Sequence, residues 1–291
     1  MTLLQSILMG ILQGLTEFLP VSSSGHLAIF ENIFHVKTET GMMFDVLLHI
    51  GTLISIFVAF HKDIWKMIVE GFGIIFDFFK NISIFFGNLS GKKKKPYIKM
   101  VGSAYRKFVM LIIVSTIPTG IIGVLGKDLV ETVSAGLLIP GICLIVTAGL
   151  LLIADHCDSG NKTPKNTKYI DAFSVGMAQG VATLPGLSRS GTTITACLLC
   201  GFDKKFAVKY SFIMSIPAIL GAALIEFKDF KSVQLAAPEI ANYMVGMSFA
   251  AVVGYICIKT MLVVVRGKKF KIFSLYCLAM GLLAVCGYFF M

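Results

Sequence analysis

Side chains that could do chemistry gather in two short stretches of an otherwise apolar chain. The first stretch holds Glu17, Ser23 and His26, and the second holds Arg189. Ser23 and His26 are three residues apart, so they can share one face of a helix. A hydroxyl beside an imidazole offers a nucleophile and an acid–base partner, and a guanidinium fork suits phosphate oxygens. These residue types predict chemistry on an anion, with phosphate favoured over a carboxylate.

The two stretches also resemble each other. When residues 13–26 are placed on residues 179–192, a shift of 166 positions, five of the fourteen positions are identical. An internal repeat is therefore present. Pro, Gly and Ser interrupt both stretches in the middle, which predicts a helix, a break and a second helix in each. Ser22 or Ser23 is expected to cap the second helix of the first stretch, and Pro185, Gly186 and Ser188 mark the corresponding helix start in the second.

Two helix N-termini that face one cavity would bind an anion, because their free N–H groups and the positive ends of their dipoles point at it. The residues expected to hold phosphate in this way are Ser22, Ser24, Gly186, Ser188, Ser190, Gly191 and Thr192.

Gln13 and Glu17 lie four residues apart on the helix that precedes the first break. They project the same way and could hold a divalent cation, Mg²⁺ or Ca²⁺, against a diphosphate. Two alternatives remain at this stage. Glu17 could instead orient or deprotonate His26, or it could form a buried ion pair with Arg189 that joins the two breaks.

The composition places these residues in a membrane protein. The chain has 291 residues, of which 56% are hydrophobic and 14% charged, and its mean hydropathy is +0.84. These values exclude an ordinary soluble domain, a disordered chain and a disulfide-rich module. A spanning helix needs about 20 mostly apolar residues. Six segments fit, at roughly 44–60, 108–126, 133–154, 207–226, 240–258 and 272–290.

The distribution of basic residues predicts the orientation. Of the 26 Lys and Arg residues, 21 lie in segments 61–107, 155–169, 203–209 and 259–271. The positive-inside rule places these segments in the cytoplasm, and both termini then lie outside. The net charge of +10 is thus explained by topology, and no nucleic-acid partner is expected. Segment 64–89 is Phe-rich but interrupted by charges, which predicts a helix along the inner membrane surface. The Lys92–Lys95 run that follows would meet anionic lipid or water.

With this topology, residues 1–35 enter from outside and residues 170–201 from inside, each as a re-entrant hairpin. The predicted fold is an all-α integral membrane protein with six transmembrane helices and two re-entrant hairpins in an inverted-topology repeat. The chain is read as one membrane domain, residues 1–291. Its first repeat covers about 1–126 and its second about 133–291.

Two motifs resemble the undecaprenyl-diphosphate phosphatase family, the integral-membrane bacitracin-resistance type. They are Gln13-Gly14-Leu15-Thr16-Glu17-Phe18-Leu19-Pro20-Val21-Ser22-Ser23-Ser24-Gly25-His26 and Pro185-Gly186-Leu187-Ser188-Arg189-Ser190-Gly191-Thr192-Thr193. Length, span count and motif spacing agree, so the resemblance covers essentially the whole chain.

The resemblance implies hydrolysis of a polyprenyl diphosphate to the monophosphate and inorganic phosphate, in a bacterial inner membrane, which recycles the lipid carrier for cell-wall synthesis. It also implies dependence on a divalent cation and a site reached from the outer face. Glu17, Ser23, His26 and Arg189 match the family's functional positions. Gln13 stands where many members have Glu, so it can donate an oxygen to a metal but no charge.

Several points stay open from the sequence. Ser23, His26 or an activated water could attack the phosphorus. A carrier or flippase for a lipid phosphate or small anion is the competing function, since inverted repeats with broken helices also suit alternating access. The expected partners are the diphosphate lipid and membrane lipids, and a homodimer is left open.

Overall fold

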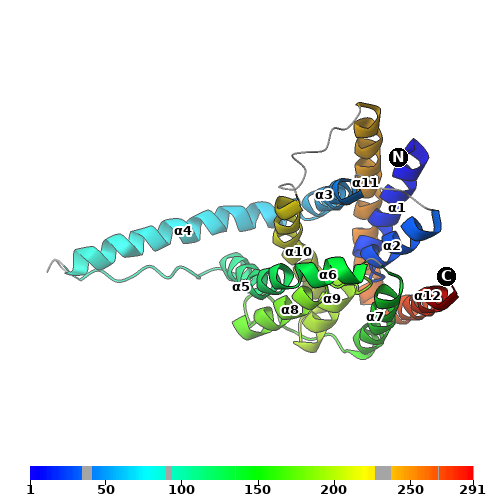
Figure 1. Cartoon of the computed structure of the whole chain (residues 1–291). Coiled ribbons are helices and arrows are strands. Elements are labelled where there is room, and N and C mark those ends of the chain that lie inside the picture. Colours follow the sequence, from blue (N-terminus) through cyan, green and yellow to red (C-terminus); the bar gives the residue numbers. More distant parts are fainter. Residues whose placement is uncertain (35–40, 90–93, 135, 227–236, 268, 291) are drawn as a thin grey trace.

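The computed structural model describes the chain except for residues 35–40, 90–93, 135, 227–236, 268 and 291. The regular secondary structure of the described part is helical, apart from one isolated bridge between Lys162 and Phe202. Its helices, shown in Figure 1, are α1 (Leu3–Phe18), α2 (Ser23–Phe34), α3 (Gly41–Ala59), α4 (His61–Leu89), α5 (Ala104–Leu125), α6 (Lys127–Ser134), α7 (Leu138–His156), α8 (Tyr169–Val181), α9 (Arg189–Leu199), α10 (Lys204–Glu226), α11 (Ala237–Arg266) and α12 (Phe270–Phe290).

Five of these helices, α5, α7, α10, α11 and α12, are long and apolar enough to cross a membrane. A sixth span is reached if α3 and α4 are counted as one, but the chain bends by 86° between them. The multi-helix membrane protein predicted from composition is therefore confirmed at this level. The predicted span 133–154 corresponds to α7, which begins only at Leu138 because the short polar helix α6 precedes it.

Glycines let the short helices α1 and α8 lie directly against long partners. A Cβ atom on Gly10 of α1 would lie 2.2 Å from the carbonyl oxygen of Gly246 in α11. A Cβ atom on Gly176 of α8 would likewise lie 2.2 Å from the carbonyl oxygen of Ser115 in α5. Small residues at helix contacts allow the close backbone approach on which packing in a membrane depends. Each broken segment is thus held along its first helix.

The basic segments predicted to be cytoplasmic contact one another at one end of the bundle. Asp63 of α4 pairs with Lys209 of α10, and Lys107 of α5 lies over the ring of Tyr169 in α8. The 155–169 loop contacts residues 201–203 through a bridge between Lys162 and Phe202. The end of α7 contacts the start of α12 through Asp155, which accepts from the N–H of Phe270. Met1, by contrast, contacts Glu239 and Asn242 at the start of α11.

Candidate active site

The first break lies between α1 and α2. Residues 19–22 interrupt the helix at Pro20, and Ser22 adopts a left-handed backbone with φ of 71°. The Ser22 hydroxyl accepts a hydrogen bond from the N–H of Gly25 at 3.3 Å. This is the bond that an N-cap residue makes to one of the unpaired amides at a helix start. Of the two capping residues that the sequence offered, Ser22 holds this position.

The second break, between α8 and α9, is built in the same way. Ser188 is the N-cap of α9, as predicted, and its hydroxyl accepts a hydrogen bond from the N–H of Gly191 at 3.1 Å. Gly186 has a φ of 87°, and a Cβ atom there would lie 2.1 Å from the carbonyl oxygen of Pro140. Only glycine suits both the backbone conformation and the space.

The two breaks touch each other. The N–H of Gly186 donates to the Ser24 hydroxyl at 3.3 Å, and the Ser190 hydroxyl donates to the carbonyl oxygen of Leu19 at 3.4 Å. A Cβ atom on Gly25 would lie 3.0 Å from the Cα atom of Gly186. Segments about 166 residues apart in the sequence therefore meet, as the repeat predicted.

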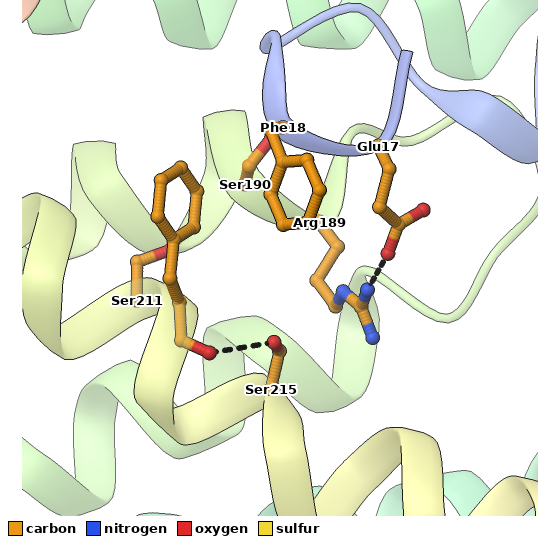
Figure 2. A pocket seen from close by; sticks show the side chains of 7 residues that line it. Glu17, Phe18, Arg189, Ser190, Ser211 and Ser215 are labelled. Atoms are coloured by element: carbon orange, nitrogen blue, oxygen red, sulfur yellow. Dashed lines mark hydrogen bonds and ion pairs between the residues drawn. The ribbon is translucent and has the colours of Figure 1, made fainter. Parts of the chain in front are cut away.

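Glu17, the last-turn carboxylate of α1, lies at this meeting point. Arg189 of α9 donates from Nη2 to Glu17 Oε1, so the two side chains form an ion pair, and Figure 2 shows them pointing towards each other. Glu17 Oε2 accepts from Ser23 Oγ at 2.7 Å and from Gln13 Nε2 at 3.1 Å. The Glu17 side chain is 4% exposed. Its negative charge is thus compensated by three donors, one of them cationic, as a buried carboxylate requires.

A small cavity opens beside this cluster, between α1, α9 and α10. Its lining residues are Glu17, Phe18, Arg189, Ser190, Ser211, Phe212 and Ser215. Its volume is about 10 Å³, which is roughly the room that one water molecule needs. In this conformation the cavity is too small for a diphosphate group.

His26 lies outside this cluster of contacts. Its Nδ1 is 2.7 Å from the carbonyl oxygen of Ser22, and its Nε2 is 2.8 Å from the hydroxyl of Tyr276 in α12. The His26 and Tyr276 rings also stack, with centroids 5.5 Å apart. Nδ1 must carry a proton to bond a carbonyl oxygen, so in the neutral ring Nε2 accepts from the tyrosine. Neither the predicted Glu17–His26 contact nor a Ser23–His26 hydrogen bond is present, because the imidazole faces α12.

In this conformation most of the predicted phosphate ligands make hydrogen bonds within the two breaks or between them. Ser22 and Ser188 cap helices, and each also lies 3.4 Å, oxygen to oxygen, from the serine two positions later. Thr192 differs, because its Oγ1 is buried and has no hydrogen-bond partner among the described residues. Of the phosphate-binding set, Ser190 alone lines the cavity.

His49 and Tyr276 are candidate functional residues that the sequence did not reveal. His49 Nε2 of α3 lies 3.9 Å from Glu17 Oε2, and its side chain is 35% exposed. Its Nδ1 is 2.8 Å from the carbonyl oxygen of Asp45, so Nδ1–H donates there and Nε2 faces the carboxylate. Both residues lie in ordinary apolar spans with no motif around them. A polar side chain inside a predicted span was the only available signal.

The protein could give a divalent cation two oxygen ligands here. Gln13 is fully buried, and its Oε1 has no hydrogen-bond partner among the described residues. Glu17 lies one turn away. Within the described residues no group of three or more His, Cys, Asp or Glu side chains could hold a metal. Hard oxygen donors suit Mg²⁺, which often binds one or two protein ligands and completes its shell with substrate phosphates and water. The donor set therefore fits a cation that arrives with a diphosphate.

The fold and the site together define an integral membrane protein in which a buried acid contacts a half-buried hydroxyl and a half-buried guanidinium, all from two interrupted helical segments. A family model described as Bacitracin resistance protein BacA matches residues 6–283, and the chain belongs to this family. The resemblance found in the sequence motifs is thereby confirmed.

Similar proteins match along nearly their whole length. An undecaprenyl-diphosphatase of Methanosphaera stadtmanae is 40% identical over 284 residues, with 97% of each chain covered. An undecaprenyl-diphosphatase of Alkaliphilus metalliredigens is 40% identical, with 98% of each chain covered. An undecaprenyl-diphosphatase of Halothermothrix orenii is 38% identical, with 98% of each chain covered.

Proposed function

We propose that this protein hydrolyses undecaprenyl diphosphate to undecaprenyl phosphate and inorganic phosphate, and so recycles the lipid carrier for cell-wall synthesis. The observation that carries the proposal is the contact of Glu17 with both Ser23 and Arg189 where the two breaks meet. Membership of the BacA family, whose relatives carry the name undecaprenyl-diphosphatase, supports the same reaction.

Substrate binding exchanges one anion for another on Arg189. The terminal phosphate displaces Glu17 from the guanidinium, because the small cavity beside the pair has no room for a phosphate group. The planar fork of Arg189 then holds two phosphate oxygens. The first amides of α2 and α9, which have no acceptor within their own helices, add further donors together with the helix dipoles. The displaced Glu17 keeps its hydrogen bond from Ser23.

Ser23 is the nucleophile that the contacts support best. Its hydroxyl already donates to Glu17 Oε2 at 2.7 Å, so Glu17 can take the proton as Ser23 Oγ attacks the terminal phosphorus. The bond from that phosphorus to the bridging oxygen breaks, and undecaprenyl phosphate leaves. Water then hydrolyses the phosphoserine to inorganic phosphate and returns the serine. His26 attack, or water activated by His26, would first require the Tyr276 hydrogen bond to break.

His26 and His49 have different roles in this scheme. His26 positions the turn before Ser23, since it bonds the Ser22 carbonyl and is held by Tyr276. His49 faces Glu17 and is partly exposed, so it can relay the proton from the carboxylate to water. A divalent cation, if bound, would be held by Gln13 and Glu17 and would neutralise the charge that develops on the bridging oxygen as undecaprenyl phosphate leaves.

We also propose the surrounding architecture. Two inverted repeats together supply six spans and two re-entrant hairpins, and the protein lies in a bacterial inner membrane. Equivalent bonds at a shift of 166 residues support it, namely the Ser22 and Ser188 caps and the matching Gly10 and Gly176 contacts. The meeting of the basic segments at one end supports a cytoplasmic location for that end and an outer location for both termini.

The decisive experiment measures phosphate release from undecaprenyl diphosphate by purified protein in detergent, with and without a chelator. Ser23→Ala should abolish turnover and the acid-stable phosphoserine trapped by rapid quenching. The matched control is Ser248→Ala, since Ser248 is exposed on α11 and bonds only its own helix. If Ser23→Ala retains near-normal turnover while His26→Ala abolishes it, the serine mechanism is wrong. If the wild type moves phosphate or lipid across proteoliposomes without hydrolysis, the carrier replaces the enzyme.

A further inference from the structure

Helix α4 carries a long apolar stripe that nothing in the described chain covers. The helix leaves α3 at 86° and extends away from the bundle as an arm (Figure 1). Large apolar side chains recur on it every three or four residues, on one face of a helix, and they are between 44% and 69% exposed. They include Trp65, Ile68, Phe72, Phe76, Phe79 and Phe86. Stripes of this size normally mark a surface that contacts something apolar.

Polar side chains on the opposite face of α4 contact the chain itself. Arg106 at the start of α5 donates to Glu70 at 2.8 Å and also pairs with Asp77. Further along, the Asn81 side chain exchanges two hydrogen bonds with the backbone of Ile98, both at 2.8 Å. These contacts fix the rotation of the helix about its axis. The apolar stripe is therefore held facing away from Ile98 and Arg106, which follow α4 in the chain and contact its opposite face.

The charges on this arm identify what the stripe meets. Segment 61–107 contains ten Lys and Arg residues but only three acidic residues. All three acids are paired, Asp63 with Lys209, and the other two with Arg106. Lys62 and Lys80, both exposed, lie beside the stripe rather than opposite it, and a run of four lysines follows the helix. An apolar stripe flanked by lysines matches the boundary between anionic headgroups and acyl chains.

We propose that α4 is an interfacial anchor that lies along the leaflet at the basic end of the bundle. Its apolar stripe enters the acyl boundary, and the lysines beside it, together with the exposed Lys94 and Lys95, bind anionic phospholipid headgroups. The bend of 86° after α3 gives the geometry. If α3 crosses the membrane as the proposed sixth span, a helix at nearly a right angle to it lies in the membrane plane. A second copy of this chain would cover the stripe equally well but would have no need of the lysines. The anchor does not depend on the proposed phosphatase activity.

The chain carries its own probe for this proposal, because Trp65 is the single tryptophan and lies on the stripe. The full protein is reconstituted in vesicles of phosphatidylcholine and phosphatidylglycerol that contain lipids brominated at defined depths. Trp65 fluorescence should be quenched about twofold more by shallow than by deep bromines, as for a helix buried 5–10 Å into the interface. In a Trp65→Phe background, Phe79→Trp should give the same depth. Lys80→Trp, one residue along, should be quenched less and be more accessible to iodide.

The anionic partner is tested at the far end of the helix. In the Trp65→Phe background, lipid quenching of Phe86→Trp should fall by about half when phosphatidylglycerol is omitted or when Lys94 and Lys95 are changed to Gln. A single symmetric peak in size-exclusion chromatography in detergent, at the wild-type elution volume, serves as the folding control for every variant. The proposal is overturned if Phe79→Trp is reached by iodide but not by bromine, if Phe86→Trp reports the bilayer centre, or if anionic lipid has no effect. Protection of Trp65 from both quenchers would assign the stripe to a second copy.

Discussion

The Glu17–Arg189 ion pair should matter for stability and for turnover through different physical effects, and a double-mutant cycle separates the two. The Glu17 side chain is 4% exposed and that of Arg189 25%. Removing one partner of a buried pair leaves an uncompensated charge and costs about 3–5 kcal/mol. Because Arg189 keeps some access to solvent, Glu17→Gln should lower the free energy of unfolding by an amount near the lower end of this range, about 3 kcal/mol. Arg189→Met should cost as much or more, since it strands the more buried carboxylate.

The double variant should recover part of this loss, because no buried charge remains. We expect a coupling free energy of about 1.5–3 kcal/mol between the two positions, within the range found for residues in direct contact. Turnover should not recover. Loss of one preorganised charge donor costs about 10²–10³ in kcat, and the double variant should be at least as slow as Arg189→Met.

The assays are equilibrium unfolding in a mixed-micelle denaturant series and phosphate release from undecaprenyl diphosphate, on the same preparations. Additive stability effects would mean that the pair does not exist in the membrane protein. Recovery of turnover in the double variant would mean that the pair only joins the two breaks, which would refute its proposed part in binding phosphate.

Three further outcomes are expected. Gln13→Glu should lower the Mg²⁺ concentration for half-maximal turnover by about tenfold, because a second carboxylate joins the site; an unchanged metal titration would place the cation elsewhere. His49→Ala should slow turnover by about 10², and imidazole added to the buffer should restore part of the rate, whereas absence of rescue would argue against a proton relay. Gly10→Ala should reduce the free energy of unfolding by about 1–3 kcal/mol, because its Cβ atom would meet a carbonyl oxygen of α11. Gly120→Ala, which meets nothing within 4 Å, is the control and should be neutral or stabilising.

Much of the site could be anticipated from local sequence. Ser188 was expected to cap a helix because Pro, Gly and Ser precede an apolar helical run, and the cap depends on a few neighbouring residues alone. The sequence offered the Glu17–Arg189 ion pair as one of two alternatives for Glu17. The pair could be anticipated because two opposite charges in apolar segments have few other partners. The other alternative, Glu17 acting on His26, does not correspond to the contacts found.

His26 illustrates what spacing cannot decide. Three residues separate it from Ser23, which permits a shared face, yet Ser23 turns to Glu17 and His26 turns to Tyr276. Tyr276 lies 250 residues further along the chain, and no local pattern predicts which helix packs on that side. His49 is a similar case, since its distance to Glu17 follows from how α3 packs on α1.

The sequence by itself determined the membrane class, the basic segments, the two broken helices and their repeat, because each depends on hydrophobicity, charge or backbone preference within about 20 residues. Only the tertiary structure decided which side chains meet, that the paired Glu17 and Arg189 line a small cavity, and which side of α4 is left uncovered. Those features depend on the packing of helices distant in sequence, and the energy of that packing lies in contacts between side chains that the linear order does not specify.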